Sequence, residues 1–225
     1  MPNYDDPRVV WNRRYAAAEG YLFGRAPNRF LAAEAHRLKP AQRVLCLADG
    51  EGRNGTYLAA RGLEVLSVDL SAVAIIKARA LAAERGVTLK LEEADLATWQ
   101  WPIEAFDAVV AIFIQFAGPD LRRRIFGNIE GSLKPGGFLL LEGYRPEQLA
   151  YGTGGPPDAA NMYTEKLLRE AFAGMDILSL RAYDAEIEEG TAHRGISALI
   201  DMVARKQVAK LSNRAGCTNA RIESR

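Results

Sequence analysis

The sequence has few cysteines and few histidines, and this limits its possible metal and redox chemistry. Among its 225 residues the only cysteines are Cys46 and Cys217, and the only histidines are His36 and His193. Cys46 lies in an apolar run that predicts a buried strand, whereas Cys217 lies in a polar segment, so we expect no disulfide. Without a Cys-x-x-Cys motif or a histidine cluster, we expect no metal site.

The sequence also lacks an excess of one charge and any segment suited to a membrane. It has 29 Lys and Arg against 28 Asp and Glu, a formal net charge of +1. We therefore expect no nucleic-acid partner and no anionic membrane surface. No apolar run reaches the roughly 18 residues of a transmembrane helix, and the start MPNYDDPRVVW is too polar for a signal peptide. These absences favour a cytoplasmic protein that is a monomer or a homodimer.

What the sequence does contain is an alternation of apolar strands and amphipathic helices. Strands are expected over residues 43–47, 64–70, 87–95, 106–114 and 138–144, and helices over 53–62, 71–86 and 119–137. Strands that alternate with helices predict a parallel, doubly wound α/β sheet. Two further strands, 176–190 and 195–206, form a closing hairpin. We expect one domain over 1–206, which begins with helices at 6–20 and 28–40, and a polar, disordered tail over 207–225.

A glycine-rich turn follows the first strand, in VLCLADGEGRNG (44–55). Read as Gly50-x-Gly52-x-x-Gly55, it matches the fingerprint of dinucleotide-binding folds. However, Asp49 and Glu51 would repel a pyrophosphate and attract an ammonium or sulfonium group. The turn therefore favours a nucleoside with a cationic tail, as in S-adenosylmethionine.

Two carboxylates at later strand ends complete this interpretation. Asp69 lies nineteen residues after Gly50, where a carboxylate can accept hydrogen bonds from a ribose diol. Asp95 ends the third strand and can accept a hydrogen bond from the adenine amine. The chain closes with a hairpin instead of a second mononucleotide-binding half, which also favours S-adenosylmethionine over NAD.

These motifs resemble a known family. The segments VLCLADGEGRNGTYLA, VDLS, EADL, FDAVVAIF and LKPGGFLLLEGY are similar to those of class I S-adenosylmethionine-dependent methyltransferases. The segments YLFGRAPNRFL, YGTGGP and EEGTAHRG resemble the branch near the tellurite-resistance and thiopurine methyltransferases. The resemblance runs from about Trp11 to Lys206.

The resemblance implies a Rossmann-like, doubly wound seven-stranded sheet whose last strand is antiparallel. It implies a helical N-terminal lid over the cofactor near Trp11, Tyr15 and Gly24. It also implies cofactor contacts at Asp49, Gly50, Glu51, Asp69, Leu70, Asp95 and Leu96. The chain departs from the family at Cys46, where many members have an acidic residue, and at Ala48, where many have glycine. Asp49 is therefore a candidate for contacts with the methionine amine.

The late segments supply the candidates for catalysis. His193, Tyr163 and Arg194 are predicted catalytic residues, and Arg145 is a further candidate for substrate binding, because all four lie after the fifth strand. His193 could instead be an ordinary hairpin residue, and Tyr163 could simply precede a helix. Within the long Gly- and Pro-rich loop 145–162, the segment YGTGGPPD (151–158) is expected to be mobile without ligand and to order over the acceptor as a lid.

The predicted reaction is methyl transfer to a small molecule, such as a thiol or a metalloid oxyanion. A thiolate, a selenide or a reduced metalloid needs no base, whereas an acceptor that is protonated at pH 7 does. Two rival interpretations stay open: an NAD-dependent reductase, and a nucleoside-binding sensor without catalytic activity.

Overall fold

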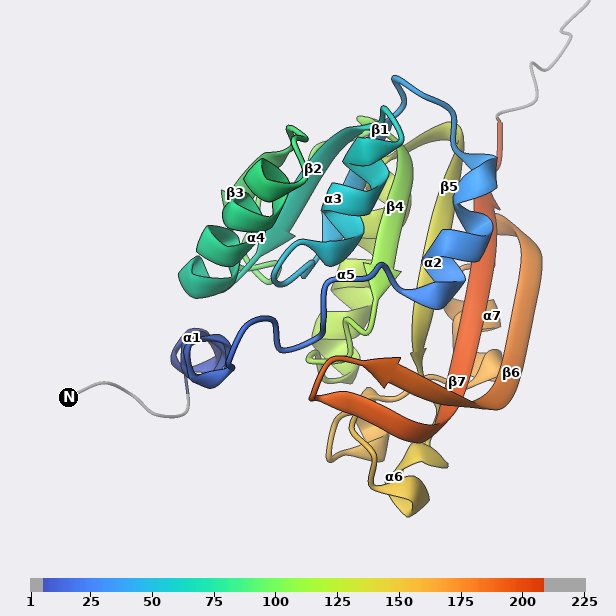
Figure 1. Cartoon of the computed structure of the whole chain (residues 1–225). Coiled ribbons are helices and arrows are strands. Elements are labelled where there is room, and N and C mark those ends of the chain that lie inside the picture. Colours follow the sequence, from blue (N-terminus) through green and yellow to red (C-terminus); the bar gives the residue numbers. More distant parts are fainter. Residues whose placement is uncertain (1–5, 209–225) are drawn as a thin grey trace, which may run out of the picture.

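The computed structural model describes residues 6–208, so Cys217 and most of the predicted tail lie outside the described part. Its centre is a seven-stranded sheet of order β3-β2-β1-β4-β5-β7-β6 (Figure 1). The strands are β1 (Arg43–Leu47), β2 (Glu64–Asp69), β3 (Lys90–Glu93), β4 (Phe106–Ile112), β5 (Leu133–Tyr144), β6 (Met175–Glu189) and β7 (His193–Lys206).

The pairing of the strands confirms the predicted doubly wound fold. Strand β1 pairs in parallel with both β2 and β4, and the parallel pairing continues to β3 on one side and β5 on the other. The last strand, β7, lies antiparallel between β5 and β6. The parallel strands end at one edge of the sheet, where open α/β folds bind their ligands.

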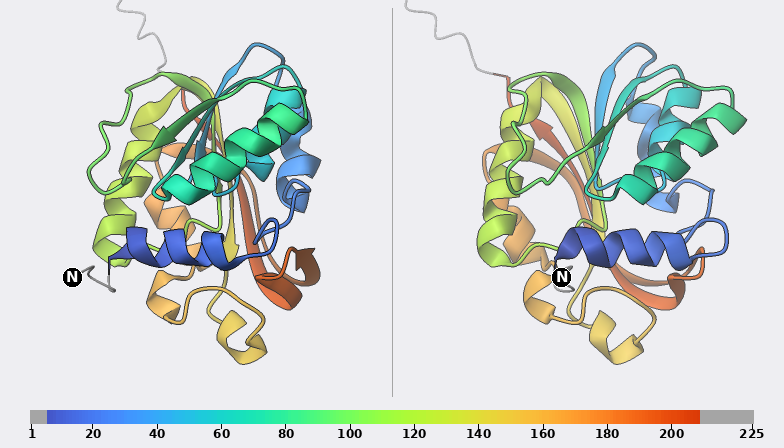
Figure 2. Two further views of the ribbon diagram at one scale, coloured as in Figure 1. Left: turned by 60° about the vertical axis from the view of Figure 1, so that its left-hand side comes forward. Right: turned by 90° about the vertical axis from the view of Figure 1, so that its left-hand side faces the viewer.

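Helices cover both faces of the sheet (Figures 1 and 2). On one face lie α2 (Arg29–Glu34), α3 (Arg53–Ala60) and α4 (Ala72–Glu84), and on the other lie α5 (Pro119–Ser132) and α7 (Glu165–Ala171). The helix α1 (Pro7–Ala17) covers neither face but runs across the carboxyl edge of the sheet (Figure 2). Within residues 6–208, none of the helices has the length and apolarity needed to cross a bilayer.

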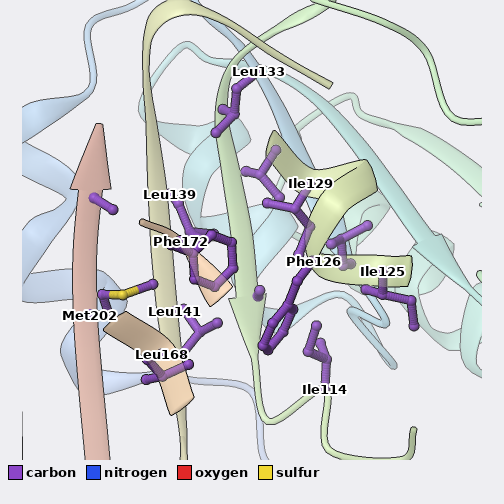
Figure 3. Close-up of a cluster of buried hydrophobic side chains, with 14 of the residues drawn as sticks. Ile114, Ile125, Phe126, Ile129, Leu133, Leu139, Leu141, Leu168, Phe172 and Met202 are labelled. Atoms are coloured by element: carbon purple, nitrogen blue, oxygen red, sulfur yellow. The ribbon is translucent and has the colours of Figure 1, made fainter. Parts of the chain in front are cut away.

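The strand sequences divide the core between the two faces. Leu45 and Leu47 of β1 belong to the cluster under α5 and α7, whereas Val44 and Cys46 belong to the cluster under α2 and α3. Alternate residues of a strand point to opposite faces, so a run that is apolar throughout fills both layers. In Figure 3 the side chains of α5 and α7 pack against Leu139, Leu141 and Met202 of the sheet.

Several element ends differ from the sequence prediction. The helix expected over 119–137 ends at Ser132, because the following residues pair into β5 beside β4. The strand expected over 87–95 is only Lys90–Glu93. The segment 145–162 is not a plain loop, since it contains the short helix α6 (Gln148–Tyr151) and a 3₁₀ turn, Ala159–Asn161.

Candidate active site

A cavity of about 730 Å³ lies at the carboxyl edge of the sheet, beneath α1. Its size falls within the range of about 300–1,000 Å³ that is typical of ligand pockets. The residues predicted to contact the cofactor all line it: Trp11, Tyr15, Gly24, Asp49, Gly50, Glu51, Asp69, Leu70, Asp95 and Leu96. The structure thus brings the ten together, and their role in cofactor binding stays a prediction.

The glycine turn is held in shape by Asp69 at the end of β2. One oxygen of its carboxylate accepts a hydrogen bond from the Gly50 N–H at 2.8 Å, and the other accepts one from the Ser71 N–H at 2.8 Å. A carboxylate has about four lone-pair sites, so Asp69 keeps acceptor capacity for a ligand. Ser71 also caps α4, by accepting from the Ala74 N–H at 3.1 Å.

The backbone of the turn requires left-handed conformations. Gly50 has φ +58° and Gly52 has φ +79°, which glycine adopts without steric cost. Ala48 also has a positive φ, +45°, although it carries a Cβ. The turn therefore keeps its shape at Ala48 at the expense of local strain.

Asp49 lies underneath the glycine turn, almost fully buried. Its Oδ2 accepts hydrogen bonds from the Ser67 hydroxyl at 2.7 Å and from the Gly55 N–H at 3.1 Å. Burial raises the pKa of Asp49 to about 7, although these two hydrogen bonds act in the opposite direction. Near neutral pH the residue is therefore only partly ionised in the free protein, and a bound cation would favour its charged form.

Glu51 is not a free carboxylate, although the predicted attraction of the turn for a cationic group depends on its charge. It forms an ion pair with Lys77 Nζ of α4 at 3.0 Å. The same ammonium donates to the carbonyls of Tyr15 at 2.6 Å and Gly20 at 2.7 Å. Glu51 thus helps to fix the N-terminal segment over the cavity, and its attraction for a ligand cation is offset by Lys77.

The N-terminal helix is attached over the cavity by several contacts. Asn12 Oδ1 accepts from the Ser71 hydroxyl at 2.6 Å, and Arg8 donates to the Leu70 carbonyl at 3.2 Å. Tyr15 stacks on Trp11, with ring centroids 5.5 Å apart. A Cβ on Gly50 would lie 2.7 Å from the Tyr15 hydroxyl, so the helix packs directly on the glycine turn.

The segment after α1 is joined to the turn between β6 and β7. The Leu22 carbonyl accepts hydrogen bonds from the N–H groups of Thr191 at 3.0 Å and Ala192 at 3.3 Å. A Cβ on Gly190 would lie 2.4 Å from the Gly24 nitrogen, so the two segments of the chain are in contact at these glycines. The two parts of the roof therefore form one connected cover.

The end of the cavity near this turn contains His193, the first residue of β7. Its Nδ1 lies 4.0 Å from a carboxylate oxygen of Glu189, which pairs with Arg53 at 2.6 Å. Burial lowers the pKa of His193, and Arg53 and Arg14 act in the same direction, so the ring is neutral at pH 7. Burial alone would raise the pKa of Glu189, but His193 and Arg53 lower this pKa to about 2.

The other residues predicted to act on the substrate lie outside the cavity. Tyr163 is fully buried behind β5, where its ring packs against Phe126 with a centroid distance of 5.6 Å. Arg194 is exposed and pairs with Glu188 at 3.7 Å, because alternate residues of β7 face opposite ways. Arg145 lies in ion pairs with Glu147 and Asp184. The geometry therefore supports a catalytic position for His193 and gives none to Tyr163, Arg194 or Arg145.

Sequence reasoning missed several residues of this end of the cavity. Arg53, Phe113, Gln115 and Tyr144 all line it. Gln115 donates to the Tyr144 carbonyl at 2.9 Å and accepts from its N–H at 2.6 Å, which fixes the end of β5. Phe113 has φ +54°, an uncommon conformation for a bulky residue. Its place directly after the apolar strand 106–112 was the only available signal.

The residues present fit a nucleoside with a cationic tail. Asp69 offers acceptor capacity at the end of β2, and apolar Leu70 and Leu96 line the same cavity. One carboxylate oxygen of Asp95 accepts a hydrogen bond from the Ala97 N–H at 2.8 Å. The glycine turn contributes the carboxylates of Asp49 and Glu51, whereas a pyrophosphate would need cations there. Within residues 6–208, no cluster of three or more His, Cys, Asp or Glu is arranged to hold a metal ion.

Comparison with curated sequences identifies related proteins. Residues 44–137 match the family described as "Methyltransferase domain". An uncharacterized protein of Mycobacterium tuberculosis is 27% identical over 180 residues, which cover 71% of this chain and 65% of that protein. A demethylmenaquinone methyltransferase of Thermus thermophilus is 34% identical over 117 residues, 51% of this chain and 53% of that enzyme. The chain thus spans about two thirds or less of these relatives.

Comparison with solved structures concerns the fold. One of these structures is described as "Conversion of a Disulfide Bond into a Thioacetal Group during Echinomycin Biosynthesis". It has a TM-score of 0.74 at 22% sequence identity, and the match covers 91% of this chain and 93% of that chain. TehB from Haemophilus influenzae has a TM-score of 0.64 at 21% identity, over 79% and 61% of the two chains. Residues 44–137 thus match a methyltransferase domain, and the fold of the chain is that of these solved structures.

Proposed function

We propose that the protein transfers the methyl group of S-adenosylmethionine to a small-molecule acceptor. The observation that carries this proposal is the acid-lined glycine turn, with Asp69 bonded to the Gly50 N–H inside the roofed cavity. When bound, the cofactor supplies an electrophilic methyl group on a sulfonium, a good leaving group. The protein's task is then mainly to align donor and acceptor.

The residues of the cavity divide this task between them. Asp69 is proposed to hold the ribose diol, Asp95 the adenine amine and Asp49 the cationic end of the methionine part. Leu70, Leu96 and Tyr15 exclude water around them. His193, neutral and buried, is proposed to take a proton from an acceptor that is protonated at pH 7.

A small acceptor suits the covered cavity and the balanced charge of the chain. We therefore keep the prediction that the partner is a small-molecule methyl acceptor, and that the protein binds neither nucleic acid nor a membrane. Thiols, metalloid oxyanions and related nucleophiles are the candidates taken from the sequence. The name of the Thermus relative adds a quinone-like ring compound to this range.

The first test is cofactor binding by calorimetry with S-adenosylmethionine, S-adenosylhomocysteine and NAD under one condition. We expect both adenosyl ligands to bind and NAD not to bind. Asp69→Asn should weaken the adenosyl ligands, whereas Asp120→Asn, a matched change at an exposed residue of α5, should not. Comparable affinity for NAD would favour the reductase instead.

The second test is turnover of a labelled methyl group with a panel of thiols, phenols, amines and metalloid oxyanions. Formation of S-adenosylhomocysteine together with a labelled product is the expected result. Tight cofactor binding without transfer to any acceptor would favour the sensor over the enzyme.

A further inference from the structure

Two residues that line the cavity each carry a buried polar atom without a hydrogen-bond partner. These are the Tyr144 hydroxyl and the His193 Nδ1, two of five such side-chain atoms among the described residues. The other three, on Ser132, Tyr163 and Asp201, belong to residues that do not line the cavity. A buried polar group without a partner is uncommon and calls for an explanation. Here the two residues lie side by side, with ring centroids 5.6 Å apart.

Aromatic rings surround these two atoms. Phe113 stacks on Tyr144, with centroids 4.6 Å apart and planes inclined by 28°, and its centroid is 4.7 Å from that of His193. The ring of Phe23, in the segment that covers the cavity, has its centroid 4.6 Å from that of His193. Phe113 holds its position with φ +54°, a strained conformation that is frequent near functional sites. These rings pack on one another and line one end of the cavity, and we call this end, lined by Phe23, Phe113, Tyr144 and His193, the slot. Its aromatic faces suit a planar ring.

The two arginines that act on His193 already have partners. Arg53 is buried in an ion pair with Glu189, and the Asn28 amide donates to the same carboxylate at 3.0 Å. Arg14 also lines the cavity, and its guanidinium lies 4.5 Å from the Trp11 ring centroid. A multiply charged oxyanion would lose its hydration here and would have to compete for cations that other groups already engage, which is unfavourable.

From this arrangement we propose that Phe113, Tyr144 and His193 form the acceptor subsite, and that the acceptor is an uncharged aromatic compound with a weakly acidic O–H or S–H group. This inference rests on the proposed methyltransferase function and narrows its substrate class. It disfavours the metalloid oxyanions that the sequence left open. The Tyr144 hydroxyl holds the acceptor's heteroatom, and His193 is the base.

The step balances without any further reactant. The acceptor's O–H or S–H gives its proton to the His193 ring. A lone pair of the acceptor's heteroatom forms the bond to the methyl carbon. The carbon–sulfur bond of the sulfonium breaks, and its electron pair stays on sulfur as S-adenosylhomocysteine. The proton then leaves His193 for solvent.

The test uses probes with one ring system. The full-length protein is first titrated with S-adenosylhomocysteine, and then, with and without that ligand, with 2-naphthol, 2-naphthylmethanethiol and 2-naphthoate. We expect naphthol or the thiol to bind and to be methylated when S-adenosylmethionine is supplied, and the carboxylate to bind at least tenfold more weakly. The first two probes decide between an O–H and an S–H acceptor.

The matched variants are Tyr144→Phe in the slot and Tyr151→Phe on the exposed helix α6, where the hydroxyl bonds to Asp184. Tyr144→Phe should weaken naphthol binding about 2- to 12-fold, the loss expected for one hydrogen bond. It should not lower the melting temperature, because the hydroxyl has no partner in the free protein. Tyr151→Phe should leave naphthol binding unchanged.

The outcomes separate the inference from the function on which it rests. If S-adenosylhomocysteine binds but selenite or tellurite is methylated and no naphthalene probe binds, the subsite proposal is overturned and the methyltransferase proposal stands. Equal binding of naphthol by Tyr144→Phe and by the unmodified protein also overturns it. If S-adenosylhomocysteine does not bind, the proposed function fails first, and naphthol binding to the free protein still reports on the slot.

Discussion

The two ends of the cavity are built in different ways. At the end near β1 and β2, the carboxylates already have protein partners: Asp69 holds Gly50 and Ser71, Asp49 holds Ser67 and Gly55, and Glu51 holds Lys77. At the end near β5 and β7, Tyr144 and His193 keep buried polar atoms without a hydrogen-bond partner. The first end is rigid before a ligand arrives, whereas the second retains unused bonding capacity. The difference suggests one end for a constant cofactor and one for the group that reacts.

The largest expected effect is on catalysis alone. His193→Ala should lower the turnover of a protonated acceptor by about 10²–10⁴, the usual contribution of a general base. Cofactor affinity should not change, because the ring lies at the other end of the cavity. Steady-state kinetics and calorimetry on the same preparation check both statements.

The control for this variant is His36→Ala, at an exposed ring bonded only to the Ala33 carbonyl. If the acceptor is instead an anion, His193→Ala should raise the Michaelis constant and leave turnover intact. A folded His193→Ala protein with both constants unaltered would return His193 to the role of a plain strand residue.

The next effect is on cofactor affinity alone. Asp69→Ala should weaken S-adenosylhomocysteine binding by about 1.5–3 kcal/mol, which is typical for hydrogen bonds to a charged group. An analogue without the ribose diol should lose much less. Calorimetry with both ligands separates a ligand contact from a general loss of structure, which would weaken both equally.

A smaller effect concerns pH and the charge of the ligand. Because the pKa of Asp49 is about 7, raising the pH through neutrality ionises it and should favour ligands that carry the methionine ammonium. Relative to an analogue without that amine, we expect the affinity for S-adenosylhomocysteine to rise by about tenfold or less between acidic and mildly alkaline conditions. Titrations across this range measure the ratio of the two affinities, and Asp49→Asn should make it independent of pH. A constant ratio in the unmodified protein would mean that Asp49 does not face the ammonium.

The smallest effect concerns backbone strain. Ala48→Gly should stabilise the protein by up to about 1 kcal/mol, because the left-handed cost for alanine slightly exceeds the entropy penalty of glycine. Ala41→Gly is the matched control, since Ala41 has φ +65° in an exposed turn. Chemical denaturation should show similar gains, but only Ala48→Gly should alter cofactor affinity. A loss of stability at position 48 would contradict the strain that we assign to it.

The same division explains what the sequence could reveal. The glycine turn, Asp69 and Asp95 follow directly after apolar strands, so their place at the sheet edge could be predicted from local pattern alone. The partners at the other end are far apart in the chain: Arg53 and Glu189 are separated by 136 positions, and Asn28 and Glu142 by 114. Arg53 and Asn28 lie at the starts of α3 and α2, and only the packing of these helices beside the sheet brings them to Glu189 of β6 and Glu142 of β5.

The wrong or incomplete expectations have the same physical origin. The carboxylates of the glycine turn were treated as free, because the sequence does not show that Lys77 reaches across from α4. Tyr163 lies on the segment after β5, but it faces the core behind the strand. Orientation relative to the sheet, and not position in the sequence, decides which late residues reach the cavity.

The hydrogen bonds from Thr191 and Ala192 to the Leu22 carbonyl have a consequence for kinetics. The helix over the cofactor end and the hairpin beside the acceptor end are joined there, so neither can swing away without breaking these bonds or carrying the other along. The methylated product and the spent cofactor would then leave through one shared opening event, with one rate constant. Loosening that junction would speed the release of both together, and would also let water reach the methyl donor before an acceptor has arrived.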